Sequence, residues 1–220
     1  WAKEMDIISW DNYPAYDTPW SYVSMCHDLM RGLKKKPFML MEQTPSQQNW
    51  QAYNSLKQPG QMRAQSLQTL AHGADTIQFF QLRRSLGACE KFHGAVIEHV
   101  GHENTRVFKE VEKLGADLEK LPSLIGAKNP AKVALMFDWE NYWALEYTSG
   151  PNVDLKYVDQ IHQYYRYFYD QHIPVDVIHP SDDLTGYDLV LAPVLYLMKE
   201  GWGEKITEYV KNGGHFFTTY

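Results

Sequence analysis

Short apolar runs, each ending in polar residues and each followed by a helical pattern, constrain this chain more than any other feature. Strands that alternate with helices in this way predict β/α units and a parallel sheet. In the first half we expect strands at Met5–Trp10, Pro37–Met41 and Asp75–Phe80, with helices near residues 20–34, 61–71 and 104–121.

A segment containing Pro, Gly and Lys, residues 121–130, separates this half from a second one with the same alternation. One helix of the second half places Tyr157, Ile161, Tyr164 and Phe168 on a single stripe, which predicts the face that packs on the core. The second half therefore indicates a doubly wound α/β domain. Its strands are expected at Lys132–Phe137, Pro174–Ile178, Tyr187–Ala192 and His215–Thr219, and its helices at Lys156–Gln171 and Glu204–Asn212.

Size and charge exclude several classes of protein. With 220 residues, 44% of them apolar, the chain can bury a core and does not have the composition of a disordered segment. A net charge of −6 argues against a surface that follows nucleic-acid phosphates. Two cysteines, Cys26 and Cys89, cannot form a disulfide framework. The longest apolar stretch, Leu189–Met198, is about half of the ~20 residues that a membrane span needs.

Both ends of the chain suggest an internal fragment of a longer protein. The first residue is Trp1 rather than Met, and Tyr220 stands within an apolar, β-branched run that is typical of a strand interior.

Glu42 is the strongest candidate for a catalytic residue. Functional side chains of parallel β/α proteins gather at the carboxyl ends of the strands. An apolar strand that ends in Glu42 holds this carboxylate on a stiff backbone, as a nucleophile or a base requires. A solvated or salt-bridged glutamate at a strand end is the alternative interpretation.

Glu90 and His93 are candidates for a polar binding site. They are three residues apart in a loop that contains glycine, so both can face one ligand if the loop turns helically. Together they offer acceptor and donor atoms for a pair of sugar hydroxyls. His99 and His102 are interpreted as surface residues, and the pattern His-Glu-x-x-His of a metal site is absent. The many aromatic residues (7 Trp, 15 Tyr and 9 Phe) suit sugar faces, or alternatively an aromatic core.

Three blocks of sequence resemble the β-galactosidases of glycoside hydrolase family 42. They are Phe38–Ser46 with Trp50, Gly87–Gly94, and Val133–Glu146, the last similar to the start of that family's trimerisation domain. The resemblance covers almost the whole chain. It implies an α/β protein that consists of the C-terminal portion of a (β/α)₈ TIM barrel, strands six to eight, over residues 1–125. A truncated flavodoxin-like, doubly wound trimerisation domain follows over residues 131–220.

The resemblance also implies an activity and roles for single residues. The family's enzymes release terminal β-D-galactose with retention of configuration, and Glu42 matches their nucleophile. By the same match Trp50 contacts the sugar, Phe80 lines the pocket, and Glu90 and His93 hold galactose hydroxyls. The implied partners are a β-galactoside and further copies of the chain in a cytoplasmic homotrimer. No cofactor is expected in this segment, although a structural zinc can lie upstream in the family.

One element of the family's site is expected to lie outside this sequence. Retaining hydrolysis needs two carboxyl groups ~5–5.5 Å apart, and the family's acid/base stands in an Asn-Glu pair on the fourth barrel strand, upstream of residue 1. The 220 residues alone are therefore expected to be inactive. Two other interpretations stay open: a related retaining glycosidase with another sugar specificity, and a non-catalytic module for galactoside binding or assembly.

Overall fold

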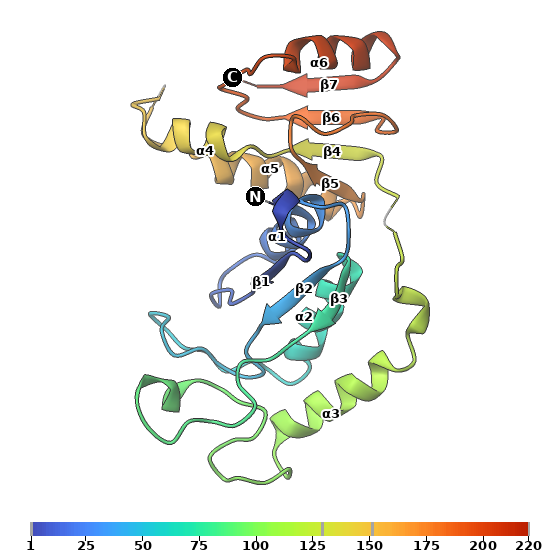
Figure 1. The fold of residues 1–220 in the computed structure, drawn as a ribbon. Coiled ribbons are helices and arrows are strands. Elements are labelled where there is room, and N and C mark those ends of the chain that lie inside the picture. Colours follow the sequence, from blue (N-terminus) through green and yellow to red (C-terminus); the bar gives the residue numbers. More distant parts are fainter. Residues whose placement is uncertain (1, 129, 151, 220) are drawn as a thin grey trace. The chain divides into compact units, whose positions relative to one another are not determined.

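The computed structural model describes residues 2–128, 130–150 and 152–219, which form two compact units (Figure 1). The first unit contains the chain up to Pro19 and Lys36–Lys128, and the second contains Trp20–Lys35 and the residues from 130 onward. Trp1 and Tyr220, which suggested a fragment, lie outside the described residues, as does position 129 of the expected linker.

A three-stranded parallel sheet forms the centre of the first unit. Its order is β1 (Ser9–Asp11), β2 (Phe38–Glu42), β3 (Ala74–Ile77), with β2 between the other two (Figure 1). Phe38 and Leu40 of β2 are fully buried. Helix α2 (Gln61–Ala71) packs on β3 and on helix α3 (Arg106–Leu118), which begins at the N-cap Thr105. Short 3₁₀ turns lie at Ala2–Glu4, Cys89–Phe92 and Pro122–Leu124.

The strands of this unit are shorter than the sequence pattern predicted. The expected strand Met5–Trp10 begins only at Ser9, because Met5 and Ile7 are exposed and only Ile8 of this run is buried. Likewise β3 ends at Ile77, before the predicted end at Phe80. Apolar runs at a strand end therefore overstate strand length, since loop residues can also be apolar.

The second unit contains a parallel sheet in the order β5-β4-β6-β7, as expected for a doubly wound domain. Strand β4 is central, so the chain moves outward from it in both directions. The strands are β4 (Val133–Met136), β5 (Val175–Ile178), β6 (Leu189–Ala192) and β7 (His215–Thr218). Helices α4 (Trp139–Glu146), α5 (Tyr157–Asp170) and α6 (Trp202–Lys211) connect them.

Alternate residues of β4 point into two separate cores. Val133 and Leu135 pack with α5 and with helix α1 (Trp20–Gly32) on one face. Ala134 and Met136 pack on the other face, where Tyr209 of α6 contributes. Both faces of a parallel sheet are buried, which is why β4 is a continuous apolar run.

The predicted stripe of α5 is confirmed as its core face. Tyr157 and Ile161 are buried, and the half-buried Tyr164 and Phe168 pack against the same core, to which Tyr165 also belongs. Helix α4 was not predicted. Its N-terminus is marked by Asp138, whose carboxylate accepts a hydrogen bond from the Asn141 backbone N–H at 3.0 Å.

Helix α1 lies within the expected first domain at residues 1–125, and its contacts place it in the second compact unit. It packs on β5 and α5, and Gly32 permits the approach, because a Cβ atom at Gly32 would stand 1.8 Å from the backbone oxygen of Val177. Arg31 bonds Asp28 and also Asp176 of β5, the latter at 2.9 Å. Polar contacts far apart in sequence therefore fix this helix on the sheet.

Helices that combine the length and the apolar character needed to cross a membrane are absent from the described part of the chain.

Candidate functional site

The backbone of Glu42 is held on both sides at the carboxyl end of β2. Asn12, which follows β1, donates its N–H to the Glu42 oxygen at 2.9 Å. On the other side the N–H of Gln43 donates to the oxygen of Gln78, beyond β3, at 3.2 Å. The half-buried carboxylate therefore starts from a rigid position at the end of the central strand.

Tyr13 contacts the candidate nucleophile directly. Its hydroxyl donates to Glu42 Oε2 at 2.8 Å, a charge-assisted hydrogen bond across 29 residues of sequence. Burial and the Glu42 carboxylate raise the pKa of the Tyr13 phenol well above its ordinary value, so this hydroxyl keeps its proton. The same surroundings raise the pKa of Asp11, through burial and the charge of Glu42. Sequence reasoning did not select Tyr13, although its position just after a strand end was a usable signal.

Trp50, Phe80 and His93 come together in an aromatic cluster that also includes Tyr13. The Trp50 and His93 rings are stacked at 5.6 Å, and Phe80 meets His93 edge-on at 5.0 Å. Tyr13 contacts both Trp50 and His93 edge-on, at 4.8 and 5.8 Å. Trp50 is 54% exposed, so it presents an apolar surface to solvent. This surface lies beside Tyr13, the residue that donates to Glu42.

Glu90 lies beside the cluster on the turn Cys89–Phe92. This segment does turn helically, which is the condition under which Glu90 and His93 can face one ligand. Asn49 donates from Nδ2 to Glu90 Oε2 at 3.3 Å, and so joins the loop after β2 to the loop after β3. The negative charge of Glu90 adds to the raised pKa of the Tyr13 phenol.

Gly94 allows the two loops to approach one another. Its N–H donates to the Gln47 oxygen at 2.9 Å, and a Cβ atom there would stand 2.8 Å from the Gln47 nitrogen. A larger residue at this position would push against the turn at Ser46 and Gln47, so this glycine permits the close approach of the two loops.

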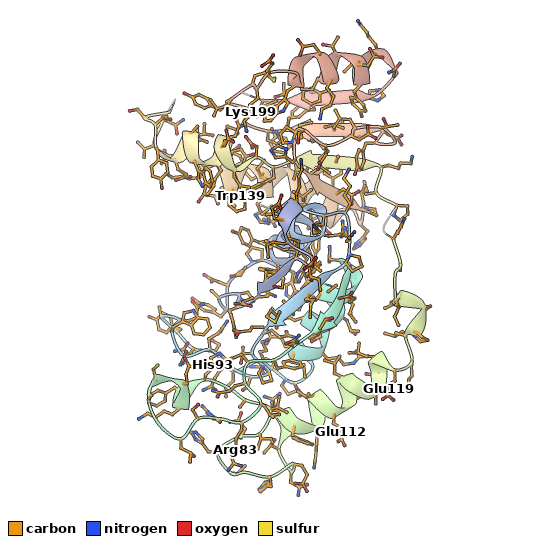
Figure 2. All side chains as sticks on the ribbon, in the orientation of Figure 1. Arg83, His93, Glu112, Glu119, Trp139 and Lys199 are labelled. Atoms are coloured by element: carbon orange, nitrogen blue, oxygen red, sulfur yellow. The ribbon has the colours of Figure 1, made fainter. Side chains whose placement is uncertain are left out.

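His93 is fully buried and has one nitrogen without a partner. Its Nδ1 lies 2.9 Å from the oxygen of Gly94, whereas Nε2 has no hydrogen-bond partner among the described residues. Figure 2 labels His93 in the loop region of the first unit. Buried polar atoms are nearly always paired, so this nitrogen is a candidate contact for a ligand hydroxyl.

In the parts of the chain that the structure describes, no three or more His, Cys, Asp or Glu side chains lie close enough together to hold a metal ion. His99, expected on the surface, is exposed and its Nε2 lies 2.8 Å from the backbone oxygen of Ser85.

Glu42 thus lies at the carboxyl end of a buried parallel strand, beside exposed aromatic rings, which is where parallel β/α enzymes carry their functional side chains. The chain belongs to glycoside hydrolase family 42: the family model described as "Beta-galactosidase" matches residues 1–121, and the model "Beta-galactosidase trimerisation domain" matches residues 131–220.

Characterised relatives agree with this assignment along the whole chain. Beta-galactosidase BgaA of Planococcus sp. (strain 'SOS Orange') is 63% identical over 222 residues, which cover 100% of this chain and 33% of that protein. Beta-galactosidase LacZ of Lactobacillus acidophilus is 56% identical over 221 residues, again 100% of this chain and 33% of the relative. This chain thus spans about a third of the length of these relatives.

A solved structure confirms the expected fold. The crystal structure of a β-galactosidase from Bacillus circulans sp. alkalophilus superposes with a TM-score of 0.98 at 58% identity, over 100% of this chain and 33% of that one. The chain is therefore the C-terminal part of a TIM barrel followed by a doubly wound trimerisation domain.

Proposed function

We propose that this chain contributes the nucleophile of a retaining β-galactosidase, and that Glu42 forms the covalent galactosyl intermediate. The observation that supports this role best is the hydrogen bond from Tyr13 to Glu42 Oε2 at 2.8 Å. It fixes the orientation of the carboxylate, as attack on an anomeric carbon requires. The relatives named as β-galactosidases supply the sugar class.

The aromatic cluster is the proposed galactose-binding surface. Trp50 offers an exposed ring for the apolar face of the sugar, and Phe80, which meets His93 edge-on, lines the same site. Glu90 and the unpaired Nε2 of His93 hold galactose hydroxyls. A carboxylate accepts hydrogen bonds and an imidazole can accept or donate, so the pair can orient neighbouring hydroxyls.

The acid/base of this proposal lies in a part of the enzyme outside this chain. Hydrolysis then uses two carboxyl groups and water, without an organic cofactor, and the 220 residues alone do not turn over an unactivated galactoside. A missing general acid costs ~10²–10⁴-fold in rate.

Covalent labelling tests the proposed nucleophile. The complete enzyme is incubated with 2-deoxy-2-fluoro-β-D-galactosyl fluoride, whose good leaving group makes the acid unnecessary, and its mass is measured. We expect one fluorogalactosyl group, which peptide mapping assigns to Glu42. An adduct on another carboxylate would disprove the assignment, and preferential reaction with arabinosides or fucosides would disprove the sugar class.

Replacing Tyr13 by phenylalanine should lower kcat by about 10²-fold, because one preorganised donor to a reacting carboxylate is lost. Steady-state kinetics with a nitrophenyl galactoside measures this effect. Tyr16→Phe is a matched control, since Tyr16 is exposed and packs on Tyr53 outside the cluster. Equal activity of the two variants would contradict a role for Tyr13.

Replacing Trp50 by alanine should mainly weaken binding, with KM raised about 10-fold or more, because a stacked aromatic surface is removed. Trp20→Ala is a suitable control, since Trp20 is also exposed and begins α1 in the second unit. An unchanged KM for Trp50→Ala would exclude this ring from the sugar site.

Residues 131–220 are proposed to join copies of the protein into a homotrimer, in the cytoplasm. The description of the matching model supports this assembly. Sedimentation of the complete enzyme should give three times the subunit mass, and a monomer at micromolar concentration would contradict it.

A further inference from the structure

Lys57 is the buried residue of an otherwise exposed stretch, residues 52–60, in the loop between β2 and α2. The Lys57 residue is 8% exposed, whereas its neighbour Leu56 is 57% exposed. Lysine is almost never buried and leucine commonly is, so Lys57 and Leu56 show the reverse of the usual burial of these residue types. Such an arrangement indicates that the ammonium group is used inside the protein.

The target of Lys57 is the turn that follows the candidate nucleophile. Its Nζ donates to the Thr44 backbone oxygen at 2.6 Å, and its N–H donates to the Ser46 oxygen at 3.0 Å. Thr44 is two residues after Glu42. Among the described residues, the Lys57 ammonium group is the hydrogen-bond donor to the Thr44 backbone oxygen.

A carboxylate does not neutralise this ammonium group, since Lys57 forms no ion pair within the described residues. Arg106 of α3 is the charged neighbour; it donates to the Lys57 backbone oxygen at 3.1 Å and pairs with Glu110. Burial accordingly lowers the pKa of Lys57 to about 7. A buried, unpaired ammonium group is a poor way to stabilise a fold. Its presence is better explained by a function of the turn that it holds.

The far end of the same turn has other anchors. The Gln47 oxygen accepts from Gly94, and Gln48 donates from Nε2 to the Pro14 oxygen at 2.8 Å. These bonds hold the Trp50 side of the loop without Lys57. Within the turn, Thr44 Oγ1 donates to the Gln47 oxygen at 2.9 Å, and strand pairing holds the backbone of Glu42 and Gln43. The Lys57 side chain adds the bond to the Thr44 carbonyl, on the Glu42 side of the turn.

We propose that Lys57 is a positioning residue for the nucleophile, which fixes the turn after Glu42 through the Thr44 carbonyl. The inference rests on the proposed function of Glu42. Displacing a reacting group by about 1 Å costs ~10²-fold in rate, so a loose turn lowers kcat while the binding surface persists.

The test is Lys57→Met in the complete enzyme, which keeps the apolar stem and removes the donor. We expect kcat to fall about 10- to 100-fold, KM to change less than about threefold, and the melting temperature to stay equal or rise. Lys109→Met on α3 is the matched control, because Lys109 is exposed, and it should behave like the wild type.

Two outcomes overturn the proposal: an unchanged kcat, or a loss of kcat accompanied by a fall of several degrees in melting temperature, which indicates support of the fold only. If Lys57→Met does not fold, Lys57→Gln places an amide one atom short of the Thr44 oxygen and should show the same loss. Labelling by the fluorogalactosyl fluoride distinguishes the proposed role of Glu42 as nucleophile from the proposed role of Lys57 as its positioning residue. No label on wild-type Glu42 refutes the proposed function, whereas equal labelling rates of wild type and Lys57→Met refute only the role of Lys57.

Discussion

Glu42→Gln in the complete enzyme should lower kcat by about 10⁴-fold or more, because the amide cannot form the covalent intermediate. The fold should persist, since the backbone bonds of Glu42 to Asn12 and of Gln43 to Gln78 do not involve the carboxylate. The amide oxygen can also still accept from Tyr13. Hydrolysis of a nitrophenyl galactoside and the melting temperature are the two measurements.

A second variant distinguishes a nucleophile from a carboxylate that only binds substrate. Glu42→Ala leaves space at the anomeric carbon, and added azide should restore turnover of the activated galactoside with formation of α-galactosyl azide. Glu112→Gln, an exposed glutamate of α3 labelled in Figure 2, serves as the control. Full activity of Glu42→Gln, or no response of Glu42→Ala to azide, would contradict the assignment.

Arg31→Met should destabilise the second unit by about 3–5 kcal/mol, because it leaves carboxylates without their cation in a largely buried place. Asp28 is 2% exposed and accepts from the Tyr165 hydroxyl as well, and Asp176 accepts from Tyr187 at 2.8 Å. These tyrosines have raised pKa values, caused by burial and by the same carboxylates. Urea unfolding followed by a probe in the second unit measures the loss.

Helix α5 offers a matched control for the Arg31→Met prediction. Arg166 pairs with Asp170 on α5 at 3.5 Å, with both side chains more than half exposed. Arg166→Met should therefore cost less than about 1 kcal/mol, as is usual for a surface pair. If both arginine variants lose the same stability, the Arg31 network does not fix α1 on the sheet.

Local patterns predicted most of the secondary structure. Helix α2 has the predicted bounds 61–71, and the four strands of the second unit begin or end within two residues of their expected limits. Apolar periodicity succeeds here because each element packs one apolar face, or two, on a core. It failed for α4, whose N-cap Asp138 was a readable signal, and at β1, where the exposed Met5 and Ile7 imitated a strand.

The candidate site was predicted only in part. Glu42 and the pair Glu90 and His93 were selected as candidates because their spacing and their place after strands are local properties. The structure then brings Trp50, Phe80 and His93 into contact, which no local pattern could show. Tyr13 also follows a strand end, but its hydrogen bond to Glu42 spans 29 positions and depends on how β1 and β2 pair.

The sequence by itself determined the alternation of strands and helices apart from α4, the doubly wound second half, the place of Glu42 at a strand end, and the family. The tertiary structure alone decided that α1 joins the second unit, that Tyr13 orients Glu42, and that Lys57 is buried while Leu56 is exposed. The physical reason is the range of the interactions. Periodicity and capping act over a few residues, whereas a hydrogen bond from Lys57 to Thr44 or from Arg31 to Asp176 depends on how distant segments pack.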